Sequence, residues 1–264
     1  MEALRFVDSL ADGALLVALA STRFAVAFLL LPIFASETVP ALVRNALFVG
    51  LGLITLAVQP AVPVQGWTAG HWLLLFGRES LLGIGLGVLL GAVLWAFEAA
   101  GQIVDAKVGA TLAQVADPLS GHQTSLSGAL LARLAMFLFM AGGGFLALVA
   151  VAVQSFAIWP LAQPGLHFDP ADVQVFESAF AQLMLLALLF AAPALVVLYV
   201  LDLALGLVNR FAPQLNLISI SMSLKSVAAT LVWVLMFTVL VDTVVARLDD
   251  GVAGLLPALR IWAP

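Results

Sequence analysis

The chain has 264 residues, of which 64 % are hydrophobic and 9 % are charged, and it contains no cysteine. A soluble domain has ~45–50 % apolar and ~25 % charged residues, so lipid or a large protein interface must surround this chain. Its net charge of −5 comes from scattered residues without a basic face, which excludes a nucleic-acid-binding protein, and the missing cysteines exclude disulfides and thiolate chemistry.

Six apolar segments are candidate membrane-spanning helices, each of which needs ~20 mostly apolar residues. In chain order they cover residues 14–34, 46–62, 72–97, 128–159, 180–201 and 227–245. The fourth is too long for one straight helix and contains Gly142-Gly143-Gly144, so we expect two pieces around a hinge or one bent helix. Pro32 and Pro193 are candidate kinks or breaks. The pattern predicts an all-α, multi-pass membrane protein, with residues 1–264 as a single membrane domain.

Charged residues inside or beside these spans are candidate functional groups. They are Arg23, Glu79, Asp202 and Asp242. A lone charge in lipid costs ~2.5–3.5 kcal/mol on insertion scales, so each should face protein, a partner charge or water. Two interpretations stay open: an ion or proton path, or pairing between helices or subunits. For Glu79, together with Arg78, a third interpretation is a cap at the start of its helix.

Small residues repeat along the third segment. Gly83, Gly87 and Gly91 are four residues apart and therefore lie on one helix face. Small residues at this spacing let helix backbones approach closely in lipid, so we expect a helix-packing face.

Signatures of an enzyme are missing from the chain. The three histidines are far apart, and Ser120-Gly121-His122 lies in a polar connection rather than at membrane depth. We therefore predict no catalytic, cofactor-binding or metal-binding residues.

The most informative polar stretch is residues 209–216, which separate two apolar segments and precede Lys225. It combines a cation, a helix breaker and three side-chain amides within eight residues, a composition that indicates a structured corner. The candidate corner residues are Asn209, Arg210, Pro213, Gln214, Asn216 and Lys225. If the chain is a subunit of a larger assembly, Arg210 and Lys225 would anchor the corner to neighbouring subunits through charge-assisted hydrogen bonds.

These motifs form an ordered series along most of the chain. The series is Arg23, Pro32-Ile33-Phe34, Glu79, Gly83, Gly101-Gln102-Ile103-Val104-Asp105, Gly109, Asp117-Pro118, Phe139, Gly142-Gly143, Ser155-Phe156, Pro160, Asp202, Gly206, the corner and Lys225. In this order it resembles the SctT/FliR family, a subunit of the bacterial type III secretion export apparatus. Ser223 stands where the family commonly has proline. The amino-acid sequence of the corner resembles that of the injectisome branch more than that of the flagellar branch.

The resemblance implies a non-enzymatic, channel-forming subunit of the export gate in the bacterial inner membrane. Its implied partners are SctR-, SctS- and SctU-like subunits, transient unfolded protein substrates and membrane lipid, with no cofactor. The helices are expected to join a spiral assembly, and the loop after the Gly101–Asp105 motif is expected to plug the pore, with Gly109, Asp117 and Pro118 as matching residues. From the residues alone, an ordinary solvent loop is the favoured interpretation of this stretch. The alternative of another class is a small-solute or ion transporter that uses the four charges.

Overall fold

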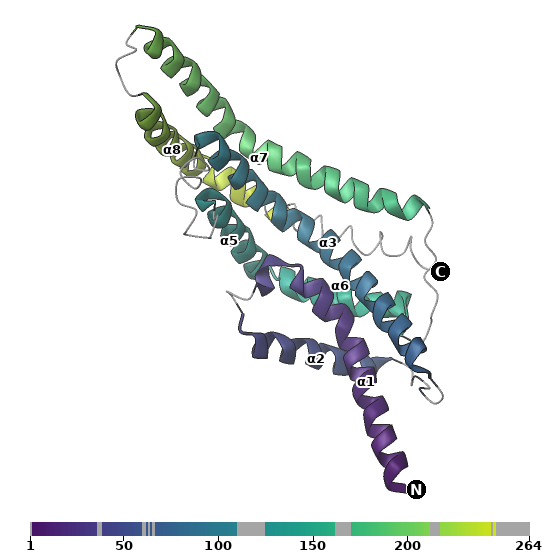
Figure 1. Cartoon of the computed structure of the whole chain (residues 1–264). Coiled ribbons are helices and arrows are strands. Elements are labelled where there is room, and N and C mark those ends of the chain that lie inside the picture. Colours follow the sequence, from purple (N-terminus) through teal and green to yellow (C-terminus); the bar gives the residue numbers. More distant parts are fainter. Residues whose placement is uncertain are drawn as a thin grey trace. The chain divides into compact units, whose positions relative to one another are not determined.

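The protein is built from helices (Figure 1). In the computed structural model, the described residues are 2–35, 39–59, 62, 64, 67–109, 125–161, 170–211, 217–243 and 245–246, and none of these forms a β-strand. The elements are α1 (Glu2–Leu29), the 3-10 helix η1 (Pro32–Phe34), α2 (Ala41–Val58), α3 (Ala69–Val108), α5 (Leu126–Ala141), α6 (Gly144–Ile158), α7 (Pro170–Phe211) and α8 (Leu217–Leu235). The all-α expectation is confirmed.

Several helices are long and apolar enough to cross a membrane. Four qualify singly, over Leu10–Leu29, Ala41–Val58, Ala69–Val108 and Val173–Phe211. Two pairs of helices that are bent at a short break raise the number to as many as six among the described residues. They are α5 with α6, and Ile220–Leu235 of α8 with the helical piece Phe237–Thr243. This agrees with the six apolar segments expected from the sequence, although the helices extend beyond several of the expected boundaries.

The chain divides into two compact units. The first takes its described residues from 1–91 and 143–179, and the second from 92–142 and 180–249. Helices α3 and α7 each contribute one part to either unit. The expectation of one domain over residues 1–264 stays a prediction.

Pro32 ends the first span, as its ring dictates. Leu31 is extended, with φ −83° and ψ 134°, because the residue before a proline is pushed out of the helical region. The short helix η1 that follows turns Phe34 into the core, where its ring stacks on Phe28 at 5.2 Å between centroids and meets Phe48 at 5.9 Å. The broken span thereby supplies an aromatic side chain to the core of the first unit.

The expected break in the fourth span is also present. Helix α5 ends at Ala141 and α6 begins at Gly144. Gly143 between them has a φ of 78°, a left-handed backbone conformation that residues other than glycine rarely adopt. The two-piece interpretation of this segment is confirmed, whereas α7 continues as one helix through Pro193.

The end of the third span was expected too early. Residues 98–108 are the last turns of α3 rather than part of a polar loop. Lys107 lies in the last turn, where a cation is favoured by the helix dipole. Gly109 then ends the helix in a left-handed conformation, with a φ of 96°, and its N–H bonds the carbonyl of Asp105 at 3.2 Å.

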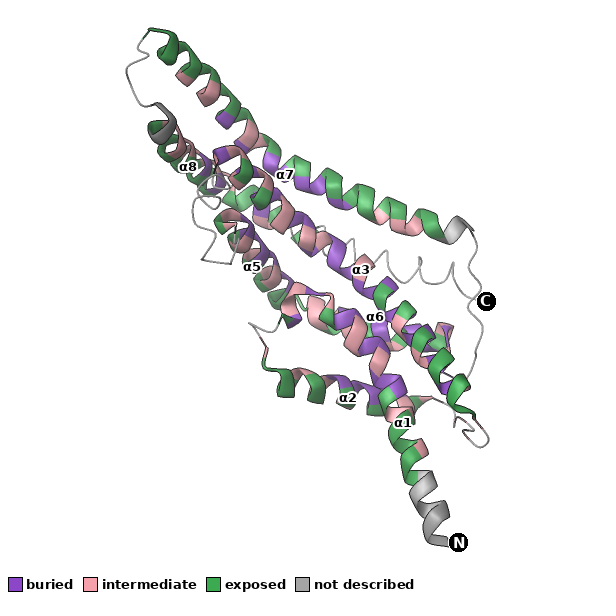
Figure 2. Cartoon of the chain, viewed as in Figure 1, coloured by how far each residue is buried: buried purple, intermediate pink, exposed green. Residues whose placement is uncertain are grey.

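Exposed residues run along much of α7 (Figure 2), and many of them are large apolar residues. Leu203 is 71 % exposed and Phe211 is 84 % exposed. A water-soluble chain would bury such residues, so these helix faces need lipid or other protein chains around them.

Candidate functional site

Two charged clusters, one in each compact unit, hold most of the charged residues singled out from the sequence. In the first unit, Arg23 of α1 and Glu79 of α3 form an ion pair of 2.7 Å between Nε and Oε2. Neither side chain has any exposed surface. Glu79 is the eleventh residue of α3, so the interpretation of Glu79 as a helix-start cap is wrong.

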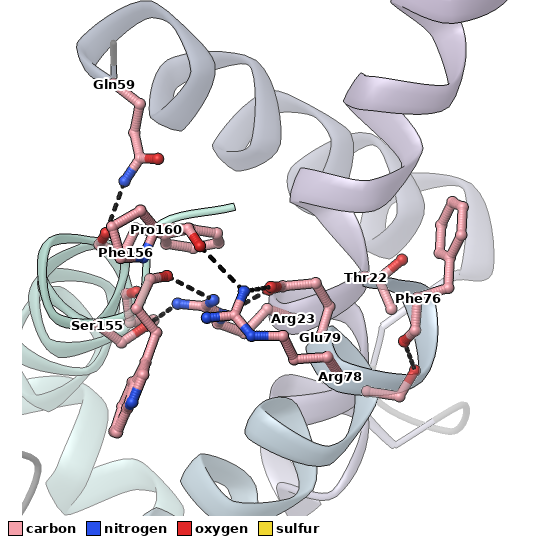
Figure 3. A network of polar contacts seen from close by, with 12 residues as sticks. Thr22, Arg23, Gln59, Phe76, Arg78, Glu79, Ser155, Phe156 and Pro160 are labelled. Atoms are coloured by element: carbon pink, nitrogen blue, oxygen red, sulfur yellow. Dashed lines mark hydrogen bonds and ion pairs between the residues drawn. The ribbon is translucent and has the colours of Figure 1, made fainter. Parts of the chain in front are cut away.

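The Arg23 guanidinium is fully engaged by α6 and the turn after it (Figure 3). Nη1 donates to Ser155 Oγ at 2.9 Å, and Nη2 donates to the Trp159 carbonyl at 3.0 Å. The guanidinium carbon also lies 3.7 Å from the centroid of the Phe156 ring, a cation–π contact. One side chain therefore connects α1, α3 and α6, and each of its nitrogen atoms has a partner.

Arg78 forms the outer part of this cluster. Its Nη1 donates to Glu79 Oε1 at 3.0 Å and to the Pro160 carbonyl at 2.9 Å (Figure 3). Its Nε is buried and has no hydrogen-bond partner. Glu79 thus bridges two guanidinium groups, and the sequence did not single out Arg78 as part of a buried cluster.

Beside this cluster, α1 and α3 approach at two of the expected packing glycines. A Cβ atom built on Gly83 would lie 2.9 Å from the Arg23 carbonyl oxygen, and one on Gly87 would lie 2.7 Å from that of Ala27. Both contacts are too short for a methyl group. Gly91 is buried in the same helix. The close approach brings Arg23 within reach of Glu79.

The second unit contains a three-membered ion cluster. Asp202 of α7 receives Lys107 Nζ of α3 at 2.7 Å on one carboxylate oxygen, and Lys225 of α8 on the other. Lys107 also lies 4.0 Å from the centroid of the Tyr199 ring. These side chains are partly exposed, with Asp202 at 32 %. One carboxylate therefore ties three helices together.

The start of α5 is held against α3 by Asp105. Its Oδ2 accepts hydrogen bonds from Ser125 Oγ at 2.6 Å and from the Ser127 backbone N–H at 2.8 Å. Gly101 allows this contact because a Cβ atom there would overlap the backbone of Ser127 and Gly128. Gly109 at the end of α3 and Ser125 before α5, which flank residues 110–124 in the sequence, are thus both hydrogen-bonded to Asp105.

The remaining predicted residues are spread over the chain. Asn209 and Arg210 are exposed in the last turn of α7, and Asp242 is exposed in the helical piece Phe237–Thr243. The other plug and corner candidates lie outside the described residues, namely Asp117, Pro118, Pro213, Gln214 and Asn216.

The chemistry available to these clusters is ion pairing. Within the described part of the chain, no group of three or more His, Cys, Asp or Glu residues could hold a metal ion. In the first unit, the bonded nitrogen and oxygen atoms of the charged side chains have their partners on the helices that meet there and on the turn after α6. Both clusters therefore join helices, and this matches the pairing interpretation of the charges Arg23, Glu79 and Asp202.

Comparison with known proteins identifies the family. Residues 14–251 match the family described as bacterial export proteins, family 1. The chain is 34 % identical to the Yop proteins translocation protein T of Yersinia pestis, over 81 % of this chain and 82 % of that protein. It is 33 % identical to the surface presentation of antigens protein SpaR of Salmonella typhimurium, over 90 % and 89 %. It is 28 % identical to the flagellar biosynthetic protein FliR of Bacillus subtilis, over 77 % and 78 %. The chain therefore belongs to family 1 of the bacterial export proteins, as its resemblance to the SctT/FliR family indicated.

Proposed function

We propose that the chain is a channel-forming subunit of a type III secretion export gate, which helps unfolded proteins cross the bacterial inner membrane. Its neighbours would be SctR-, SctS- and SctU-like subunits. The family and the relatives support a place in an export apparatus. The injectisome relatives, at 34 % and 33 % identity, are closer than the flagellar relative at 28 %, which favours the injectisome branch.

The observation that carries this proposal is the length of the apolar helices. Helix α3 has 40 residues and α7 has 42, which at ~1.5 Å per residue gives about 60 Å and 63 Å. The hydrocarbon core of a bilayer is only ~30 Å thick, and tilting of a helix accounts for a small part of such an excess.

Lipid therefore covers at most part of each apolar surface. Apolar residues are exposed along most of α7, from Val173 (65 %) to Phe211 (84 %). Other protein chains are the remaining apolar partners, so the helices suit an assembly better than a monomer in a bilayer. A conduit surrounded by several such subunits would also accept an unfolded chain without any catalytic group.

The charges disfavour the transporter alternative. An ion path needs groups that exchange their partners and that water reaches. Arg23 and Glu79 are wholly buried and bonded to each other, and Asp202 is held between two lysines. Of the four charged residues, Asp242 is exposed and has no ion pair within the described part of the chain.

Purification from membranes tests the proposal. Expressed alone, the chain should be poorly behaved in detergent, and co-expression with SctR- and SctS-like subunits should yield a stable complex that contains it. A bacterium that lacks the chain should lose type III secretion and regain it when the chain is supplied. A stable monomer that transports a small solute in vesicles would contradict the proposal.

A further inference from the structure

One side of α5, in the second compact unit, is exposed from its start to its end. The residues along it, here called the α5 stripe, are Leu126, Leu130, Arg133, Phe137 and Met140. They follow one another at intervals of four, three, four and three residues, so they share one helix face. The four apolar side chains are 83 %, 60 %, 68 % and 48 % exposed, whereas Leu131, Ala135 and Phe139 on the opposite side are buried. The described part of the chain therefore covers one side of α5 and leaves the other uncovered.

The centre of the α5 stripe is a positive charge. Arg133 is exposed and forms no ion pair with any residue in the described part of the chain. It lies seven residues from Leu126 and seven from Met140, or about 10 Å from each. A guanidinium group keeps its charge in proteins, so it needs water or an acceptor. Because this one is on the surface, a side chain of another molecule can reach it.

Neither water nor lipid suits the whole α5 stripe. Water would surround four large apolar side chains, and a contiguous exposed face of this kind marks an interaction site. Acyl chains would cover these side chains, but an unpaired charge among them is costly. Arginines near the end of a helix escape this cost by reaching the lipid headgroups, whereas Arg133 is in the middle of α5.

The spacing of the α5 stripe fits a second helix. Alternating intervals of three and four residues average about 3.5 residues, the repeat at which the side chains of two helices interlock along a seam. The stripe covers two such repeats from Leu126 to Met140. A single polar residue in a seam of this kind fixes the register and the choice of partner. A carboxylate that faces Arg133 would complete the seam with a charge-assisted hydrogen bond.

We propose that an apolar helix of a neighbouring export subunit packs along the α5 stripe, and that an Asp or Glu on this helix pairs with Arg133. Such a helix covers the four apolar side chains and also neutralises the guanidinium group. The exposed residues Leu53, Ile54 and Val58 of α2 carry no charge, so lipid alone is sufficient to cover them. The inference rests on the proposed function, because it requires an assembly.

Photo-crosslinking in the assembled complex tests the contact. A photoreactive amino acid at position 130 or 137 should form an adduct with one and the same other subunit, and the two attachment sites should flank an Asp or Glu on one apolar helix. The matched control is position 54 of α2, which is 56 % exposed and should give no adduct with that helix. Adducts with lipid only, with a peptide of this same chain, or with a helix that has no acidic residue would each overturn the inference.

Substitutions of Arg133 test the ion pair. Arg133→Glu places two like charges opposite each other and should lower the amount of the crosslinked subunit that copurifies with the chain at least ~10-fold. Changing the acidic residue of the partner helix to arginine should restore copurification, because the pair is then reversed. Arg133→Lys keeps the charge and should retain most of the complex. Failure of the reversed pair to restore the complex would overturn the inference.

Arg133→Leu separates the partner helix from lipid. Removing an unpaired charge from a lipid-facing surface should raise the yield of the complex, whereas removing one member of a buried ion pair should lower it. We expect the lower yield, and an equal or higher yield would contradict the ion pair. If the chain still assembles with other export subunits and these contrary results occur, the inference alone fails. If the chain joins no such complex, the proposed function fails as well.

Discussion

Arg23 Nε donates a 2.7 Å hydrogen bond to Glu79 Oε2 between side chains that are 56 residues apart in sequence and wholly buried. The pair lies where α1 crosses α3, beside glycines that bring the two helices together. Its other contacts, to Ser155 and the Trp159 carbonyl, extend the junction to α6. The polar core of the first unit is thus organised around one guanidinium group.

Removing the Glu79 charge should destabilise the first unit strongly. In Glu79→Gln, two buried guanidinium groups lose their shared counter-charge, and breaking a buried pair in this way typically costs ~3–5 kcal/mol. Thermal denaturation of the purified complex should show a lower Tm, and the amount of assembled complex in membranes should fall. The matched control is Glu177→Gln, since Glu177 is exposed on α7 in the same unit. An unchanged Tm for Glu79→Gln would show that the ion pair contributes nothing to the fold.

Alanine at the packing glycines should separate α1 from α3. A methyl group at Gly87 would come within 2.7 Å of the Ala27 carbonyl, and one at Gly83 within 2.9 Å of the Arg23 carbonyl. Overpacking of this kind typically costs ~1–3 kcal/mol. By contrast, Gly50→Ala enters open space and should be neutral or stabilise the complex by up to ~1 kcal/mol through helix propensity. The Tm values of the three variants measure the difference, and equal values would refute close packing at these sites.

Asp202 should matter more than either lysine that it binds. Asp202→Asn leaves Lys107 and Lys225 facing each other without a carboxylate, whereas replacing one lysine leaves one ion pair intact. Because these groups are partly exposed, each pair should be worth no more than about 1 kcal/mol, and less at high salt. Denaturation of Asp202→Asn, Lys107→Met and Lys225→Met at low and high ionic strength gives the order. A larger loss for a lysine variant than for Asp202→Asn would contradict the shared-carboxylate arrangement.

Deleting residues 110–122 should open the pore if this segment is the plug. We expect the variant complex to assemble normally, because Asp105 and Gly101 outside the deletion make the contacts with the start of α5. Bacteria or vesicles with the variant should become permeable to small solutes that the native complex excludes. Co-purification of the other subunits controls for assembly. Unchanged permeability in an assembled complex would count against a plug and favour an ordinary loop.

Composition and local pattern were sufficient to predict the class of fold and two of its breaks. Apolar length alone indicates membrane-spanning helices, and proline and glycine act on their own backbone, so the breaks at Pro32 and Gly143 follow from chemistry within a few residues. The ends of the helices were harder to predict from the sequence. Residues 98–108 look polar enough for a loop, yet they continue α3, and Asp105 in this part accepts hydrogen bonds from Ser125 Oγ and the Ser127 N–H at the start of α5.

The sequence by itself determined that this is a multi-pass helical membrane protein with a few charges that need partners, and its ordered motifs indicated the export family. Only the tertiary structure decided which charges meet: Arg23 with Glu79, and Asp202 with Lys107 and Lys225. It also showed that Arg78 belongs to a buried cluster. The physical reason is that helical periodicity is a local property, whereas an ion pair between helices depends on which faces pack together and at what height along them.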